Sequence, residues 1–474
     1  MTGTDLFVSK PYGLLLQTDT DSACTLADIS CPVFPGGVRA GDPFSLRIKA
    51  VAWQRDGEAR TAAALADNPV TPNFQLNDIT LSSTLMAPDP GSTGTLLPAA
   101  HHQLLGTQTT TVAAISEVGV FTLSATPTVD GYFGKTVDGG KSALVGRFIP
   151  AYLDVAGTAS LTPSCGSAFS YQGQPMGFAA GQEPSLRVSG HNRAGVVTSN
   201  YDRSDFWRLA APAVGGYASV TAEFEVADPA DPAALANRDA RLTSQGTASL
   251  AVSGADSGDG AQVYRWRDEV LLYTPAILPG SADYPFQARI RQSFSAAALT
   301  DADGACYLGG MAECQPFSYD FAELPGSQVR LGRLRIGNAH GSELQALNLP
   351  LTIETWQATA TGSAFVREGL DNCSAGVLGA PVLDGFSGQL TEGETTPSVE
   401  PPSAGVGQLG LTAPGAGNTG SVRVHFAGAP SPALPPTWLH YDWTGTGREA
   451  ARGLATFGIY SGPTPLIFRR ELYR

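Results

Sequence analysis

The fold is most clearly predicted by residues 329–356, which read VRLGRLRIGNAHGSELQALNLPLTIETW. In the second half of this stretch, apolar and polar residues alternate from Leu347 to Ile353. An alternation with a period of two is typical of a half-buried β-strand, because successive side chains leave the backbone on opposite faces. Pro350 lies on the polar face and has no N–H to give to a neighbouring strand, so we expect either an edge strand or an unpaired amide position there.

The first half of the stretch also alternates, but its phase shifts by one residue. Val329 and Leu331 occupy odd positions, whereas Leu334 and Ile336 occupy even ones. A one-residue shift beside a glycine, here Gly332, is typical of a β-bulge. The GNAHGS segment that follows has the composition of a turn. The whole stretch is therefore predicted to form a long β-hairpin.

The composition favours an exported all-β protein over several other classes. A length of 474 residues suggests about three domains, and 55 glycines and 34 prolines with only 15% charged residues favour short strands joined by turns. No window of 18 residues is continuously apolar, so we expect no membrane span. The net charge of −14 and the absence of a Lys/Arg cluster argue against a nucleic-acid groove.

Two parts of the chain share a pattern that suggests an internal duplication. Pro43–Ile48 reads PFSLRI and Pro184–Val188 reads PSLRV. Each segment is followed by a glycine-containing turn and then by an asparagine–aromatic pair, at residues 73–74 and 200–201. We interpret the pattern as a repeated immunoglobulin-like β-sandwich, with chance resemblance as the alternative.

The predicted architecture is an elongated series of tandem immunoglobulin-like β-sandwich units, stapled by disulfides. We expect the first unit at residues 1–155, the second at 156–299 and a C-terminal β-domain at 300–474. The low-complexity segment around residues 390–405 is too poor in apolar side chains to order itself, so we predict a mobile loop there.

The six cysteines suggest three disulfides and an oxidising compartment. Cys24 and Cys31 are close in sequence, as are Cys306 and Cys314, and elimination leaves Cys165 to pair with Cys373. Zinc is the rival interpretation, but the chain has no C-x2-C motif and no neighbouring histidine pair. The first residues lack the features of a signal peptide, so we expect a C-terminal part of a longer exported protein.

An ordered set of motifs gives the chain a family resemblance from about residue 5 to its end. These motifs are VGRFIP at 145–150, FSYQGQP at 169–175, NY at 200–201, DADG at 301–304, GRLRIGNAHGSEL at 332–344, DNC at 371–373, WLHYD at 438–442 and ATFGIY at 455–460. The set resembles the C-terminal domain of unknown function of MshQ-type proteins, which are associated with biogenesis of the mannose-sensitive haemagglutinin, a type IV pilus. The resemblance implies a secreted or cell-surface protein and no catalytic activity.

Asp301 and Asp303 form the strongest candidate for a metal site. Two carboxylates two residues apart and followed by glycine can contribute oxygen ligands to calcium. The alternative is a turn in which the aspartate side chain caps its own backbone and Gly304 takes a positive φ. Calcium is therefore a possible ligand, and we expect no other cofactor.

The aromatic residues Trp438, Tyr441 and Trp443 are a candidate glycan or partner surface. The alternative is that they pack in the core or in cross-strand pairs. The chain contains neither the H-E-x-x-H motif nor the G-x-S-x-G motif, so we expect no enzyme. The expected function is a structural or adhesive component that meets pilin or minor pilus proteins. The alternative is a secreted lectin-like module that binds host or surface glycans.

Overall fold

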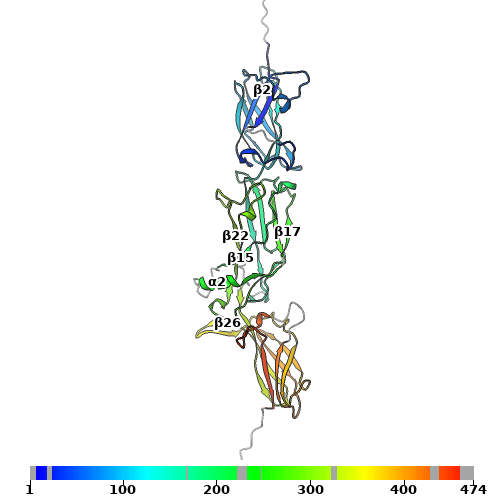
Figure 1. Ribbon diagram of the computed structural model, residues 1–474, viewed down its shortest axis with the longest axis vertical. Helices are drawn as coiled ribbons and strands as arrows, with labels where there is room; N and C mark the ends of the chain where they lie inside the picture. Colours follow the sequence, from blue (N-terminus) through cyan, green and yellow to red (C-terminus); the bar gives the residue numbers. More distant parts are fainter. Residues whose placement is uncertain are drawn as a thin grey trace, which may run out of the picture.

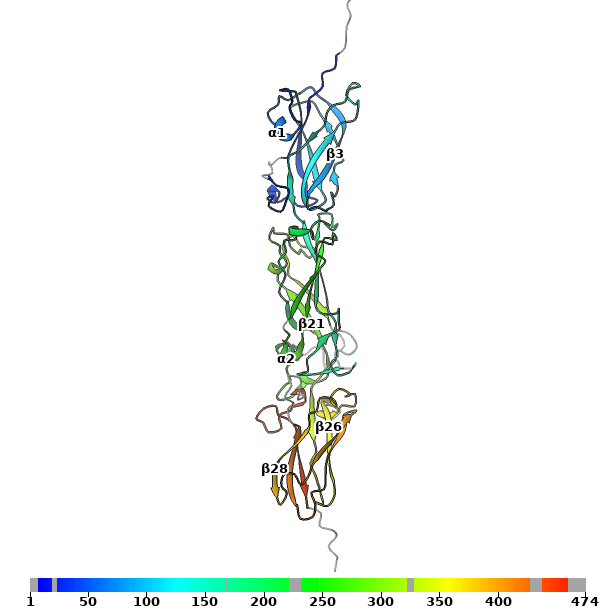
Figure 2. The same ribbon diagram turned by 90° about the vertical axis from the view of Figure 1, so that its right-hand side faces the viewer.

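A computed structural model shows three β-sandwich units stacked end to end in an elongated rod (Figures 1 and 2). The structure describes residues 7–18, 24–166, 169–220, 232–246, 248–321, 328–426 and 437–458. We call residues 7–148 unit one, residues 149–330 unit two and residues 331–458 unit three. The predicted all-β, tandem immunoglobulin-like and disulfide-stapled architecture is confirmed.

Unit one is a sandwich of two antiparallel sheets. The first sheet has the order β1 (Gly13–Thr18), β2 (Phe44–Val51), β6 (Thr109–Ile115), β4 (Leu96–Leu97). The second has the order β5 (Ala100–Gln103), β3 (Leu76–Ala87), β7 (Gly119–Thr126), β8 (Gly140–Lys141), with β9 (Val145–Phe148) also on β7. The short helix α1 (Ala62–Leu65) lies in the loop after β2. The inward-facing residues of β2, including Leu46 and Ile48, are fully buried between the two sheets.

Unit two repeats the sandwich and adds small accessory sheets. Its main sheets have the orders β10 (Tyr152–Thr158), β14 (Ser185–His191), β18 (Ala261–Arg267), β17 (Ser249–Ser253) and β15 (Gly216–Val220), β21 (Arg289–Phe294), β22 (Phe317–Phe321). The accessory pairs are β11 (Leu161–Thr162) with β13 (Gly177–Phe178) and β16 (Leu242–Ser244) with β19 (Leu271–Tyr273). A three-stranded sheet has the order β12 (Phe169–Tyr171), β23 (Gln328–Arg330), β20 (Phe286–Gln287), and helix α2 spans Pro232–Arg241.

Unit three is again a two-sheet sandwich. One sheet has the order β24 (Gly332–Ile336), β26 (Leu347–Thr359), β30 (Val406–Leu411), β29 (Pro397–Ser403), with β27 (Gly362–Arg367) also on β26. The other has the order β25 (Ala339–Gly341), β32 (Arg452–Phe457), β31 (Gly420–Phe426), β28 (Pro381–Gly388). Short 3-10 turns occur at Pro35–Gly37, Ser204–Phe206, Ser281–Asp283, Ala297–Leu299 and Thr437–Leu439.

The hairpin predicted at residues 329–356 is present only in part. β24 and β26 pair antiparallel with Gly332 opposite Thr355, and the alternating leucines from Leu347 to Ile353 are buried as expected. The phase shift at Gly332 is a crossing between domains and not a β-bulge. Val329 belongs to β23 in unit two, whereas the strand after Gly332 belongs to unit three. A side chain at Gly332 would come within 2.5 Å of the Tyr171 ring, which explains the glycine.

Pro350 lies in a central strand, so the expectation of an edge strand is wrong. β26 pairs with β24 on one side and β30 on the other, and Pro350 lies opposite Gln408 of β30. The pairing with β24 ends at Leu351, and the Pro350 carbonyl accepts the Gly337 N–H at 2.8 Å. The backbone N and O of a strand residue point to the same side of the strand. The N–H that Pro350 lacks would therefore point toward β24, just beyond the last residue pair of β24 and β26. The second expectation, an unpaired amide position, describes this site.

Two other expectations differ from the structure. The boundary expected between residues 299 and 300 is misplaced, because β22 pairs with β21 and so residues up to 321 belong to unit two. The boundary expected between residues 155 and 156 is also misplaced, because it falls inside β10. Part of the predicted mobile loop at 390–405 is strand β29, which pairs with β30. Prolines are tolerated there because β29 is the edge strand of its sheet. Residues 459–474 of the expected C-terminal domain lie outside the described residues.

Candidate functional site

The functional features of the structure gather at the two junctions between units. At the first junction, Arg147 of β9 in unit one meets Asp303 of unit two in a two-pronged ion pair. Its nitrogens Nη1 and Nη2 lie 2.5 and 2.9 Å from the two carboxylate oxygens. The side chains are only 6% and 9% exposed. A buried, bidentate pair of this kind fixes both distance and orientation.

Asp301 and Asp303, the possible calcium ligands, are therefore both engaged by protein groups. Asp301 accepts hydrogen bonds from the Tyr201 hydroxyl at 2.8 Å and from the backbone N–H groups of Asp303 and Ala305. Burial raises the pKa of Asp301, and the Tyr201 hydrogen bond opposes this effect. Asp303 faces a guanidinium, which would repel a metal cation. The capped turn, with Gly304 at a φ of +85°, is the interpretation that fits.

Asn200 makes a second polar contact across the first junction. Its Oδ1 accepts the Ser92 N–H at 2.7 Å, and its Nδ2 donates to the carbonyls of Ser92 and Val118, both at 2.8 Å. Ser92 and Val118 belong to unit one, whereas Asn200 belongs to the loop that follows β14 in unit two. The Asn200 side chain is 1% exposed, so its hydrogen-bonding groups are satisfied entirely within the junction.

Glu117 of unit one completes this polar set. Its carboxylate accepts hydrogen bonds from the Ser199 N–H and hydroxyl, both at 3.0 Å, and from the Asn200 N–H at 3.2 Å. Burial raises the pKa of Glu117, and these hydrogen bonds lower it. Apolar residues of unit one, among them Val118 and Val120, also pack into the core of unit two. The two units are therefore joined by a common apolar cluster and by one buried polar network.

A disulfide closes the second junction. The structure contains the three bonds Cys24–Cys31, Cys165–Cys373 and Cys306–Cys314, which are the pairs expected from the sequence. Cys165 precedes β12 of unit two, and Cys373 lies in unit three. The Tyr171 hydroxyl of β12 donates to Asp371 at 2.5 Å, and burial raises the pKa of Tyr171 further above its usual range. Because Cys165 and Cys373 are bonded to each other, they offer no thiolate to a metal beside Asp371.

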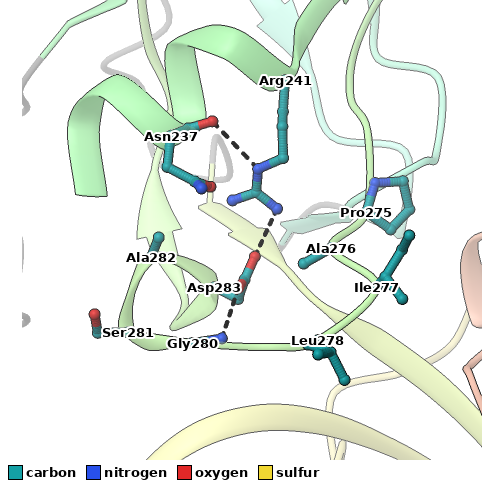
Figure 3. A pocket seen from close by; sticks show the side chains of 10 residues that line it. All are labelled: Asn237, Arg241, Pro275, Ala276, Ile277, Leu278, Gly280, Ser281, Ala282 and Asp283. Carbon is teal, nitrogen blue, oxygen red and sulfur yellow. Dashed lines mark hydrogen bonds and ion pairs between the residues drawn. The ribbon is translucent and has the colours of Figure 1, made fainter. Parts of the chain in front are cut away.

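A pocket of about 550 Å³ opens beside this junction (Figure 3). Arg241 of α2 donates to Asp283 at 2.6 Å in its floor, and Asp283 accepts the Gly280 N–H. Leu278 on its rim is 80% exposed. Unit three reaches the same loop, since the Trp356 indole N–H donates to the Gly280 carbonyl at 3.0 Å.

Arg448 of unit three makes a further contact with this loop. It donates to the Ala276 carbonyl at 3.1 Å and to the Trp438 carbonyl at 3.3 Å. Burial lowers the pKa of Arg448 to about 10. Arg448 therefore ties the pocket loop of unit two to the 3-10 turn at Thr437–Leu439.

The expected aromatic surface is divided in the structure. Tyr441 and Trp443 lie together, with ring centres 5.1 Å apart, and the Arg333 guanidinium lies 5.0 and 4.9 Å from them. Arg333 also stacks on Phe365 at 3.8 Å, a partner that the sequence did not indicate. Trp438 does not join this cluster, because its half-buried ring packs against the core of unit three.

The comparisons with known proteins identify the family. The second domain of DUF6701 matches residues 10–113, the third matches 117–319 and the fourth matches 330–472. The chain belongs to the DUF6701 family. The break between the third and fourth DUF6701 domains, at 319–330, agrees with the passage from unit two to unit three. The third DUF6701 domain begins at residue 117, although β7 to β9 belong to the sandwich of unit one.

The other comparisons add little about this DUF6701 chain. No curated protein matches it. Among the solved structures that match is the crystal structure of invasin, described as a bacterial integrin-binding protein, with 8% identity and a TM-score of 0.22. The alignment covers 87% of this chain and 56% of the invasin chain, so the DUF6701 chain spans about half of invasin. In the described residues, no helix has the length and apolar character needed to cross a membrane.

Proposed function

We infer that this chain is an exported structural or adhesive component of the bacterial cell surface, and that it works as a stiff spacer. The observation that carries this inference is that both junctions of the rod are locked. One is held by the buried Arg147–Asp303 pair and the other by the Cys165–Cys373 disulfide. Domains that move freely usually meet through smaller and more polar interfaces.

The three disulfides support an oxidising location, because such bonds persist in exported proteins and are rare in the cytosol. The resemblance to MshQ-type proteins supports the finer part of the proposal, an association with a type IV pilus. The proposed role is mechanical: the chain holds what is attached at one end at a fixed distance and angle from the other. It requires no catalytic step and no cofactor.

A glycan-binding role is the second candidate, and the paired rings of Tyr441 and Trp443 favour it. Trp443 is 38% exposed, so one aromatic surface is open to solvent. Aromatic faces of this kind stack against apolar surfaces while their polar edges remain wet. The Arg333 guanidinium already contacts both rings, so a sugar would have to use the outer face of Trp443.

One experiment separates the two roles. The purified chain is immobilised and tested against purified type IV pilin, purified minor pilins and a glycan array, with Trp443→Ala as the variant. Saturable binding to a pilin that Trp443→Ala leaves unchanged is the expected result. Selective glycan binding that Trp443→Ala removes would replace the spacer proposal with the lectin. Binding to none of these probes, together with an absence of the chain from the surface of intact cells, would overturn both.

A further inference from the structure

The loop by which unit two holds unit one has a counterpart in unit one. In unit two, the chain leaves β14 and forms a turn in which the Thr198 N–H donates to the Gly190 carbonyl at 2.9 Å. The Tyr201 N–H then donates to the Thr198 carbonyl at 3.1 Å. This turn places Asn200, which forms hydrogen bonds with the Ser92 backbone, at the end of unit two that faces unit one.

Unit one forms the same turn after β2. The Thr71 N–H donates to the Ala50 carbonyl at 2.8 Å, and the Phe74 N–H donates to the Thr71 carbonyl at 3.2 Å. The TPNF sequence at 71–74 thus takes the place of TSNY at 198–201, and Asn73 takes the place of Asn200. The asparagine–aromatic repeat in the sequence is therefore a repeat of one structural device.

The two asparagines differ in what they meet. Asn200 is buried and its amide has three hydrogen bonds to unit one. Asn73 is exposed, and its side chain has no hydrogen-bond partner among the described residues. Asn73 lies at the end of unit one farthest from unit two. Asp42, two residues before β2, pairs with Arg193 of unit two, and β2 runs from Phe44 away from that junction to Val51. The turn of unit two therefore contacts unit one, whereas the equivalent turn of unit one contacts no other unit in the described part of the chain.

The surface around Asn73 has the character of an uncovered interface. Asn73 lines a hollow of about 690 Å³ together with Phe133 and Leu105. Phe133 is 78% exposed and Leu105 is 63% exposed. Exposed apolar side chains that gather at one place on a soluble domain commonly mark a contact surface. Phe133 also has a φ of +48°, which is unusual for a bulky residue. We call Asn73, Leu105 and Phe133 the distal face.

The path of the chain also leads to this face. Tyr12 enters β1 by donating its N–H to the Val51 carbonyl, as Ala151 enters β10 by donating to His191, both at 2.8 Å. Pro11 and Pro150 each lie two residues before the first residue of their strand. The segment before β1 therefore matches the linker that joins unit one to unit two. The matched DUF6701 domains are the second to the fourth, and the family's numbering includes a first.

We propose that the distal face docks a further domain, the first domain of the DUF6701 family, in the way that unit two docks unit one. The Asn73 side chain accepts a backbone N–H and donates to a backbone carbonyl of an end loop of that domain, and Phe133 and Leu105 pack beneath this loop. One contact is not repeated. Pro72 stands where Ser199 stands in unit two and has neither an N–H nor a hydroxyl, so an acid equivalent to Glu117 would find only the Asn73 N–H. This docking is independent of the proposed surface role.

The test joins the first domain of a DUF6701 protein in front of residue 7 and compares hydrogen exchange in the joined and the present chain. We expect at least tenfold slower exchange at residues 73–78 and 128–136 in the joined chain. Asn73→Ala in the joined chain should return most of that protection. Asn200→Ala is the positive control and should speed exchange at the existing junction, and Asn237→Ala, an exposed asparagine of unit two, should change neither region.

Equal exchange at the distal face with and without the first domain would overturn the proposal. Protection that appears in the present chain alone at high concentration would also overturn it, because the occupant would then be a second copy. Protection that appears only when a glycan mixture is added would assign the face to a sugar instead. Unchanged exchange in β2 and in residues 79–87 of β3 shows that Asn73→Ala remains folded, so a loss of protection at the face can be read as a loss of docking.

Discussion

The Arg147–Asp303 pair makes the most specific prediction about the first junction. Replacing Arg147 by Met or Asp303 by Leu leaves one buried charge without its partner. Breaking a buried pair in this way costs about 3–5 kcal/mol, whereas an exposed pair contributes only about 0–1 kcal/mol. The Arg147 and Asp303 side chains are 6% and 9% exposed, so this is a buried pair. Arg208 lies 3.9 Å from Asp303 and can partly replace Arg147 as its partner, so the cost of Arg147→Met should be at the lower end of this range.

The same junction contains a matched control. Arg193 of unit two and Asp42 of unit one also pair across the boundary, at 2.6 Å, but the Arg193 side chain is 58% exposed. Arg193→Met should therefore change the free energy of opening by less than about 1 kcal/mol. The two pairs have similar geometry and differ mainly in burial, so the comparison isolates the effect of burial.

The assay is native-state hydrogen exchange at amides that report on this boundary. The Ser92 N–H of unit one donates to the Asn200 Oδ1 of unit two at 2.7 Å, and the Ser199 N–H of unit two donates to the Glu117 carboxylate of unit one at 3.0 Å. Their exchange gives a free energy of local opening without assuming that a multidomain chain unfolds in one step. The double variant should cost less than the sum of the two singles, because it leaves no unpaired charge. Single variants that each cost under about 0.5 kcal/mol would refute the claim that this pair locks the junction.

Two further predictions concern the second junction and the pH dependence of the first. The Cys165–Cys373 bond spans 208 residues and Cys306–Cys314 spans 8; loop-closure entropy gives about 5 kcal/mol for the long loop and about 2.5 kcal/mol for the short one. Replacing both Cys165 and Cys373 by Ser should therefore lower the thermal midpoint of the chain more than the matched change at Cys306 and Cys314, and an equal effect in calorimetry would contradict this. Burial raises the pKa of Glu117 above 4.5 in the folded chain, so its contribution to stability is complete below pH 4.5 and is lost as the pH rises through the folded pKa. Exchange at the Asn200 and Val118 amides measured from pH 4.5 to 7 should show a smaller pH dependence in Glu117→Gln, and an unchanged slope would show that Glu117 does not titrate in this range.

Features that depend on near neighbours in the sequence were predicted well. The alternation from Leu347 to Ile353 predicted the buried face of β26, because a period of two is a local property of a strand. The phase shift at Gly332 was misassigned, because a bulge and a passage between domains produce the same one-residue change. The composition of 390–405 predicted disorder, but the backbone of β29 is held by pairing with β30, and edge pairing does not require an apolar sequence.

Features that depend on distant partners were predicted poorly. The ion pair of Asp303 with Arg147 was not predicted, because the two residues lie 156 residues apart in the sequence. The repeat that includes Asn200 was visible, but its role across a junction was not, because a turn motif does not say which domain it faces. The Arg333 cluster with Phe365 and Tyr441 brings together three separate segments, and no spacing in the sequence predicts it.

The central claim is that the three units form one stiff rod, and small-angle X-ray scattering of the purified chain tests it most directly. The scattering curve calculated from the single arrangement in Figure 1 should reproduce the measured curve for the described units. The Arg147→Met and Cys165→Ser/Cys373→Ser variants should each need an added population of bent chains. A curve for the unaltered chain that only a broad ensemble of bent arrangements can fit would contradict the account.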